Sequence, residues 1–353
     1  MEGLQTYDGP GAWRGPDLVA RTDWRHTFTP DEVETLAAAA DAVAEREIVS
    51  LQAADFDLGD LDPVLAKVRD DLAEGRGFVL LRGLPVEDWP IARTARVYWA
   101  ICSRVGQPIA QNQYGNLLGH VTDVGGDSSH PRQRAYQSSD GLPFHSDIGA
   151  ETVGLLCLQT ARAGGESHLV SAAPLWNELV ATRPELAKAL SEPFHLDRRG
   201  ETVEGQDPWF TIPVFMPTAA QLFAAYNPRF VRSAQRFPEL PRLTDLQEEG
   251  LDAVMTLAND PRFKLAMDFQ PGDIQLINNH RLLHSRGAFE DWPDPVRRRH
   301  LLRIWMCAPG GKPIPEPLYS RFGADEETGR PKGINLPPGV PLSAPLEPPA
   351  LRT

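Results

Sequence analysis

Three potential metal ligands constrain the fold of this chain more than any other feature of its sequence. His145 and Asp147 lie two residues apart, whereas His284 follows much later in the chain. On a β-strand the side chains of His145 and Asp147 would point to the same face, because every second residue of a strand does so. A fold that uses all three residues must therefore bring the strand of His284 to the same end of a barrel.

Two histidines and one carboxylate match the facial triad that binds non-haem Fe(II) and leaves positions open for a co-substrate and O₂. A His-x-Asp pair alone is weak support, because the chain has nine histidines and such pairs arise by chance. The context of His284 strengthens it, since this residue follows a Pro-Gly-Asp turn and a short apolar run at 271–277. The other histidines we interpret as ordinary surface, loop or packing residues: His26, His120, His130, His168, His195, His280 and His300.

Two arginines follow His284 and are expected on one strand. Arg299 and Arg303 are four residues apart, so they would share a face. Arginine binds a carboxylate through a planar fork and stays charged when buried, which suits a co-substrate with two carboxylates held between a metal and a guanidinium. One arginine could hold this co-substrate and the other the substrate. The alternative for each is a surface ion pair, which is our interpretation of Arg297 and Arg298.

The composition limits the classes of function. A net charge of −13 over 353 residues, without a dense basic run, disfavours nucleic-acid binding. We find no apolar stretch of the length of a membrane span, no signal peptide and no closely spaced cysteines. We therefore expect a cytoplasmic protein that binds a small molecule rather than nucleic acid or a membrane. Homo-oligomer formation is left open.

The N-terminal part is expected to carry helices around one buried strand. Residues 1–28 are predicted to form an irregular arm, and Thr29, Pro30 and Glu32 then form a capping box that starts a helix reaching Arg46. Further helices are predicted from Asp62 to about residue 75 and over 91–105, with a strand at 77–83. Residues 107–140 are rich in polar residues and glycine and lie just before His145, so we expect a substrate lid there.

The remainder predicts many short strands. We expect strands at 153–158, 168–171, 208–216, 222–226 and 300–306, helices at 173–190 and 244–257, and a hairpin over 263–277 around the Pro-Gly-Asp turn. Residues 309–353 are rich in proline and predict a tail that is extended and either wraps the surface or is flexible. The expected fold is mainly β with flanking helices (α+β), a sandwich or jelly roll over 29–308 with a helix-and-strand insert at 173–258.

Several segments, in this order and spacing, resemble the TauD/TfdA branch of the Fe(II)/2-oxoglutarate-dependent dioxygenases. The resemblance covers roughly residues 76–307 and is carried by the segments 77–83, 144–147, 164–167, 271–273, 278–286 and 299–303.

This resemblance implies a double-stranded β-helix with Fe(II) on His145, Asp147 and His284. It also implies that Arg299 binds the distal carboxylate of 2-oxoglutarate, assisted by Ser167 at a position where the family commonly has threonine. Family halogenases lack the metal-binding carboxylate, so Asp147 argues against halogenation. The implied reaction uses O₂, releases succinate and CO₂, and most often hydroxylates a C–H bond. Desaturation and ring closure are alternatives that use the same oxidant.

Two other classes of function compete with this interpretation: a non-catalytic metal-binding jelly roll and a zinc hydrolase. A hydrolase needs no carboxylate clamp, and a degenerate binding module should have lost a ligand. For the substrate we expect a small polar or carboxylate-bearing molecule, possibly derived from an amino acid. Our candidate substrate contacts are Tyr136, Gln137 and Arg303, and the expected lid also carries Asn112, Tyr114 and Arg134.

Overall fold

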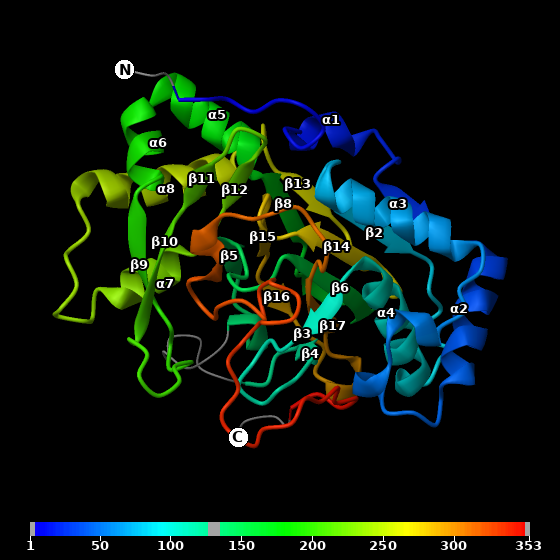
Figure 1. Ribbon diagram of the computed structural model, residues 1–353. Helices are drawn as coiled ribbons and strands as arrows, with labels where there is room; N and C mark the ends of the chain where they lie inside the picture. Colours follow the sequence, from blue (N-terminus) through cyan, green and yellow to red (C-terminus); the bar gives the residue numbers. More distant parts are fainter. Residues whose placement is uncertain (1–3, 126–134, 350–353) are drawn as a thin grey trace.

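Two β-sheets face each other at the centre of the computed structural model, which describes residues 4–125 and 135–349 (Figure 1). The larger sheet has the order β1 (Arg25–Thr27), β2 (Phe78–Arg82), β14 (Ile274–Asn278), β6 (Thr152–Gln159), β17 (His300–Cys307) and β3 (Gln107–Ile109), with β4 (Leu118–Val121) also paired to β17. The smaller sheet has the order β13 (Leu265–Met267), β8 (Ser167–Ser171), β15 (Leu282–Arg286) and β5 (Leu142–His145).

Alternation along the strands fills the space between the sheets. In β17, Leu302 and Ile304 pack on the outer face against helices, whereas Trp305 belongs to the cluster between the sheets. That inner cluster joins Phe78 and Val153 of the larger sheet with Leu169, Leu265 and Leu282 of the smaller one. The predicted fold class, mainly β with flanking helices on a jelly roll, is confirmed.

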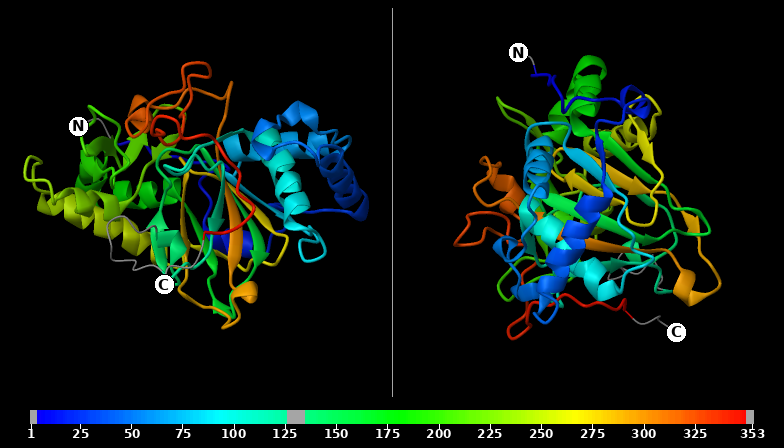
Figure 2. Two further views of the ribbon diagram at one scale, coloured as in Figure 1. Left: turned by 90° about the horizontal axis from the view of Figure 1, so that it is seen from below. Right: turned by 90° about the vertical axis from the view of Figure 1, so that its right-hand side faces the viewer.

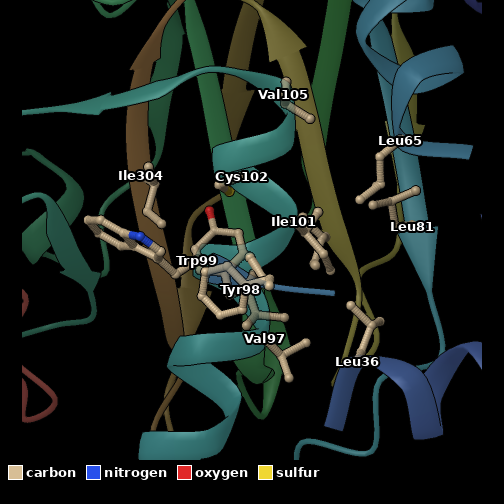
Figure 3. Packing of buried hydrophobic residues seen from close by; sticks show 14 of the residues in the cluster. Leu36, Leu65, Leu81, Val97, Tyr98, Trp99, Ile101, Cys102, Val105 and Ile304 are labelled. Atoms are coloured by element: carbon tan, nitrogen blue, oxygen red, sulfur yellow. The ribbon is translucent and has the colours of Figure 1, made fainter. Parts of the chain in front are cut away.

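Three helices cover the outer face of the larger sheet: α2 (Pro30–Ala42), α3 (Leu61–Ala73) and α4 (Ile91–Val105). The predicted capping box forms at the start of α2, where Thr29 Oγ1 accepts from the Glu32 N–H and the Glu32 carboxylate accepts from the Thr29 N–H. Figure 3 shows Tyr98, Ile101 and Cys102 of α4 packed against the sheet near Ile304. The opposite, inner face of this sheet carries Arg303 and Trp305 of β17, which belong to the candidate active site described below.

The smaller sheet is covered by the insert, on the other side of the molecule from α2, α3 and α4 (Figure 2). The insert contains α5 (Ala172–Thr182), α6 (Pro184–Leu190), α7 (Pro228–Ala234), α8 (Asp245–Asn259) and two ribbons, β9 (Pro193–Asp197) with β10 (Trp209–Pro213) and β11 (Phe215–Pro217) with β12 (Leu222–Ala224). The short remaining elements are α1 (Gly15–Val19), the pair β7 (Ala163–Gly164) and β16 (Phe289–Glu290), and the 3₁₀ turns η1 (Ile48–Ser50), η2 (Ala53–Asp55), η3 (Ala135–Gln137), η4 (Pro295–Arg297) and η5 (Glu316–Tyr319). No helix in the described residues has the length and apolar character needed to cross a bilayer.

The predicted hairpin over 263–277 is wrong. β13 pairs with β8 in the smaller sheet, whereas β14 pairs with β2 and β6 in the larger one. The turn between them therefore carries the chain from one sheet to the other, and Arg82 anchors it through two hydrogen bonds to the Asp273 carboxylate. Leu265 and Met267 point into the core in either arrangement, so their alternation could not identify the partner strand.

Four other expectations need correction. The predicted helix at 173–190 is two helices, because Pro184 cannot continue the helix that ends at Thr182. The predicted irregular arm contributes α1 and also β1, which pairs in parallel with β2. The segment 107–121 of the expected lid contains β3 and β4, while 126–134 lies outside the described residues. Of the two arrangements expected for the C-terminal tail, the flexible one is wrong, because the tail packs against the domain with Arg321, Phe322 and Arg330 buried.

Candidate active site

His145, Asp147 and His284 converge at one end of the smaller sheet. His145 is the last residue of β5 and lies directly opposite His284 of β15, with ring centroids 4.3 Å apart. His145 Nε2 lies 3.7 Å from Asp147 Oδ1, and the three residues place one potential ligand atom each within 4.8 Å of one another. Within residues 4–125 and 135–349, no other group of histidine, cysteine or acidic side chains meets this criterion.

The protonation states of these side chains suit a metal. His145 Nδ1 lies 2.9 Å from the Pro143 carbonyl oxygen, which can only accept, so this nitrogen carries the proton and Nε2 is left as a ligand. Burial lowers the pKa of His145, and burial together with the neighbouring His145 lowers the pKa of His284 to about 3. Both rings are therefore neutral at physiological pH, which is the form that binds metals.

Asp147 lies beyond the end of β5, not on the strand as expected from the two-residue spacing. Its position is fixed by Asn279, a buried residue directly after β14. Asn279 Oδ1 accepts from the Asp147 N–H at 2.8 Å, and Asn279 Nδ2 donates to the carbonyl oxygens of Asp147 and Ala150, both at 2.8 Å. One amide side chain therefore holds the loop that presents the carboxylate.

We expect Asn279→Ala to lower the affinity for divalent metal by about 10- to 100-fold, the range typical of residues that orient a ligand. The substitution leaves three backbone groups of the Asp147 loop without their partner. Anaerobic titration with Fe(II) or Co(II) measures the affinity. Asn278→Ala is the matched control, because Asn278 donates instead to the Leu72 carbonyl in α3; equal losses in both variants would contradict a specific role for Asn279.

The Asp147 carboxylate is held by two donors from β17. Asp147 Oδ2 accepts from Trp305 Nε1 at 2.9 Å and from Arg303 Nη1 at 3.3 Å. Arg303 also donates through Nε to Gln111 Oε1 at 2.7 Å and stacks on the Tyr136 ring at 4.3 Å. Burial alone would raise the pKa of Asp147, but Arg303, the two imidazoles and the indole N–H outweigh it and lower the pKa to about 2. The carboxylate is therefore ionised as a ligand must be.

Arg299 supplies a second charged group to the same cavity. It lies just before β17 and is 5% exposed, and its Nη1 is buried without a hydrogen-bond partner among the described residues. Burial lowers the pKa of Arg299. A Cβ on Gly165 would lie 3.1 Å from Arg299 Nε, so the Gly164-Gly165 turn leaves room for this side chain. A buried guanidinium that lacks a partner is costly and is well suited to an anionic ligand.

Residues 40–305 match the family described as taurine catabolism dioxygenase TauD, TfdA family. The chain belongs to the TauD/TfdA family. It is therefore a non-haem iron oxygenase whose cofactor is Fe(II) and whose co-substrates are 2-oxoglutarate and O₂.

Individual TauD/TfdA relatives match most or part of the chain. FR-33289 synthase of Streptomyces rubellomurinus (strain ATCC 31215) is 28% identical over 321 residues, which are 89% of this chain and 94% of the relative. A uridine-5'-phosphate dioxygenase of Amycolatopsis sp is 31% identical over 225 residues, 61% of this chain and 79% of the relative. The crystal structure of asparagine oxygenase with Fe(II), 2S,3S-3-hydroxyasparagine and succinate has the same fold, with a TM-score of 0.63 and 16% identity over 80% of this chain and 93% of that one.

A cavity of about 1050 Å³ joins these groups in the TauD/TfdA domain. His145, Asp147, His284 and both Arg299 and Arg303 line it, so the five charged or metal-binding candidates predicted from the sequence come together. The lining also contains two further predicted site residues, Ser167 and Tyr136. The Ser167 hydroxyl is buried and lies 3.3 Å from Gln275 Nε2, which donates to it.

Other candidates lie elsewhere. Gln137 does not line the cavity, and its carbonyl accepts from the Val124 N–H. Asn112 and Tyr114 do not line it either, and Arg134 lies outside the described residues. The substrate contacts of Tyr136, Gln137 and Arg303 stay predictions.

Sequence reasoning missed several residues of the site. One of them is Arg286 of β15, which lines the cavity. It lies two residues after His284 and therefore faces the same side of the strand, so the spacing in the sequence could have indicated it. Arg321 reaches the cavity from the C-terminal tail, and Arg199 and Arg229 reach it from the insert. No spacing relative to the triad could have indicated these three, because they come from segments that only the tertiary fold brings together.

Proposed function

We propose that the enzyme hydroxylates a C–H bond of a small polar, anionic molecule. In this proposal His145, Asp147 and His284 hold Fe(II), and Arg299 and Ser167 bind the distal carboxylate of 2-oxoglutarate. Bound iron and 2-oxoglutarate supply, from O₂, an oxidant for C–H bonds, with succinate and CO₂ as co-products.

The observation that carries the proposal is Arg299 in the same cavity as the triad. Its guanidinium is buried, and no carboxylate of the described residues forms an ion pair with it. A 2-oxoglutarate dianion whose keto acid end is held at the triad would offer its second carboxylate to such a fork. The residue thus has a natural partner in the co-substrate and none in the described protein.

The protein residues around the triad position and protect the reacting groups. Asn279 fixes the Asp147 loop. Trp305 and Arg303 both donate to Asp147 Oδ2, and the other oxygen, Oδ1, faces His145. Ile148 and Phe144, both buried, flank the ligand segment. An ordered ligand set of this kind favours coupling of O₂ consumption to the substrate.

The other classes of function fit these contacts less well. A zinc hydrolase has no use for a buried arginine without a counter-ion, and a non-catalytic module has no need for the large cavity at the triad. Halogenation requires a free metal position where the carboxylate stands, and Asp147 fills that position. Desaturation or ring closure by the same oxidant is the alternative outcome, and product analysis distinguishes it.

The relatives support a small polar substrate. One relative is named for uridine-5'-phosphate, and the asparagine oxygenase structure holds a hydroxylated amino acid beside succinate. The expected class, a polar or carboxylate-bearing molecule possibly derived from an amino acid, is compatible with the arginine-lined cavity. An apolar substrate would make no favourable contact with the charged groups that line this cavity.

We expect the enzyme with Fe(II), 2-oxoglutarate and chloride under O₂ to release succinate in step with a hydroxylated product. Candidate amino acids, organic acids and phosphorylated compounds are screened by succinate release, and the products are identified by mass spectrometry. Reactions lacking either O₂ or 2-oxoglutarate are the controls. Product formed equally well in those controls would overturn the oxygenase assignment, and a chlorinated product would overturn hydroxylation.

A further inference from the structure

The loop that carries Asp147 joins β5 to β6. Its residues, 146–151, form a turn and irregular backbone, so contacts from other segments decide where the loop places the carboxylate. Asn279 supplies some of these contacts from the end of β14. The C-terminal tail supplies others through Arg321, Phe322 and Arg330, which we call the tail brace.

Arg321 holds the residue directly after Asp147. Its Nη1 donates to the Ile148 carbonyl oxygen at 2.6 Å, and its Nη2 donates to Glu201 of the insert at 2.8 Å. Burial lowers the pKa of Arg321 to about 10, and the negative charge of Asp147 opposes this effect. The guanidinium is therefore charged at neutral pH and lies within electrostatic reach of the carboxylate that it helps to place.

Phe322 packs against the loop at Gly149. This glycine has a φ of 124°, a conformation that residues with a side chain rarely adopt. A Cβ at this position would lie 2.7 Å from Phe322 Cε2 and 3.8 Å from Trp305 Cζ3. The backbone therefore lies close both to a ring of the tail and to the indole that donates to Asp147 Oδ2. A shift of the loop towards Phe322 would displace that ring.

Arg330 and Glu151 form a bidentate ion pair at the end of the loop. Arg330 Nε donates to Glu151 Oε1 at 2.7 Å, and Arg330 Nη2 donates to Oε2. Each residue is only 6% exposed. The backbone of Glu151 is also held, because its N–H donates to the Met306 carbonyl at 3.1 Å and its carbonyl accepts from the Asn279 N–H at 2.8 Å. The ion pair thus joins the tail to a residue that β17 and Asn279 already contact.

The position and the chemistry of these contacts indicate more than attachment of the tail. Farther along the chain, backbone hydrogen bonds attach the tail to the domain, since the Ser343 N–H donates to the Gly115 carbonyl and the Ser343 carbonyl accepts from the Leu117 N–H. The brace instead uses side chains that reach the loop just after Asp147. A buried ion pair adds little net stability, because the cost of desolvation offsets the attraction, but it can specify one arrangement of the groups that it joins.

We propose that the tail brace positions the Asp147 carboxylate for iron, so that full metal affinity requires the docked C-terminal tail. The inference rests on the proposed function, in which Asp147 is one of three Fe(II) ligands. Asn279 fixes the backbone of Asp147 itself, whereas the brace fixes residues 148, 149 and 151. Loss of a brace contact would let the loop place the carboxylate in other positions, and metal affinity falls with the fraction of molecules in the competent arrangement.

The test is titration of the full-length protein with Co(II), a divalent ion that substitutes for Fe(II) and absorbs visible light. We expect Arg330→Gln and Glu151→Gln each to weaken Co(II) binding by about tenfold, in the range typical of residues that orient a ligand. The double variant should lose no more than either single variant, because the two residues act as one pair. Lys312→Gln is the matched control in the tail and should stay within about twofold of wild type, because its exposed ion pair with Glu74 belongs to α3 and not to the loop.

The absorption spectrum of bound Co(II) separates positioning from a general loss of stability, because its bands depend on the arrangement of the ligands. We expect these bands to change in Arg330→Gln and to equal those of the wild type in Lys312→Gln. Arg330→Lys keeps the charge and should regain part of the affinity. Thermal unfolding without metal shows which variants are folded. Wild-type affinity and a wild-type spectrum in folded Arg330→Gln would overturn the proposal.

Hydrogen exchange of the unaltered protein tests the brace even if Arg330→Gln fails to fold. If docking of the tail raises the metal affinity, metal must stabilise the docked tail by the same factor. We therefore expect Co(II) to slow exchange over residues 321–330 by about tenfold and to leave α2, on the outer face of the larger sheet, unchanged. Equal exchange over 321–330 with and without Co(II) would contradict the proposal.

The histidine ligands separate the two levels of inference. Undiminished Co(II) binding in both His145→Ala and His284→Ala would refute the proposed iron site itself. Loss of Co(II) binding in both of these variants, with wild-type affinity in Arg330→Gln, would refute the tail brace alone.

Discussion

His145→Ala and His284→Ala are each expected to abolish the charge-transfer absorption that Fe(II) and 2-oxoglutarate give with the wild-type enzyme under anaerobic conditions. The two imidazoles face each other across paired strands, with centroids 4.3 Å apart, and within the described residues they and Asp147 form the group of potential ligands, so each variant removes one of three ligands. Residues that merely orient a ligand are worth about 10- to 100-fold in metal affinity, so loss of a ligand should cost more than about 100-fold. Titration with Fe(II) and absorption spectroscopy measure both effects.

A third histidine variant controls for indirect effects. His195→Ala changes a partly exposed histidine of β9 that does not line the cavity, so its band should equal that of the wild type. Circular dichroism shows whether each variant is folded. An undiminished band in both His145→Ala and His284→Ala would mean that iron binds through other residues.

Local signals in the sequence were sufficient for elements whose stability is local. The capping box at Thr29 and Glu32 fixes the start of α2, and the apolar periodicity of 91–105 defines α4, so both were predicted at their N-termini. The C-terminal end of α2 was not predicted, because the sequence between Ala42 and Arg46 carries no signal that stops a helix. Strand pairing was the weak point, as β13 and β14 show, because alternation reports which face is buried and not which strand lies beside it.

In the site, too, local features were predictable from the sequence and contacts between distant segments were not. The convergence of the triad was predicted because His145 and Asp147 lie only two residues apart and the order of the flanking segments resembles a family. The support of Asp147 by Asn279 was not predicted, because the contact joins residues far apart in the chain. The contribution of the proline-rich tail was also missed, because composition describes a tail as extended and cannot reveal that Arg321 is buried beside Ile148.

The two arginines of the 299–303 segment differ more than their spacing implied. Arg303 lies within β17, whereas Arg299 precedes that strand, and the pairing of β17 with β6 shifts register between His300 and Leu301. This irregularity removes the simple rule that residues four apart share a face. Arg303 accordingly contacts Asp147, while Arg299 packs near Phe289 and Gly165.

Arg299→Leu is expected to weaken 2-oxoglutarate binding by orders of magnitude while the iron still binds. Removing one side of a buried charge pair costs about 3–5 kcal/mol, because the remaining charge loses its partner. In this variant the distal carboxylate of the co-substrate loses its charged hydrogen-bond partner. Titration of the anaerobic Fe(II) enzyme with 2-oxoglutarate, followed through the charge-transfer band, gives the affinity, and separate Fe(II) titration reports on the triad.

Two further variants make this result specific. Arg297→Leu, an exposed arginine that stacks on Trp292, should leave 2-oxoglutarate affinity unchanged. Arg303→Leu should instead weaken Fe(II) binding, because Asp147 loses a charged donor. If Arg303→Leu weakened 2-oxoglutarate binding and Arg299→Leu did not, the roles of the two arginines would be reversed. The structure argues against that reversal, because Arg303 already has Asp147 and Gln111 as partners, whereas the buried Nη1 of Arg299 has none among the described residues.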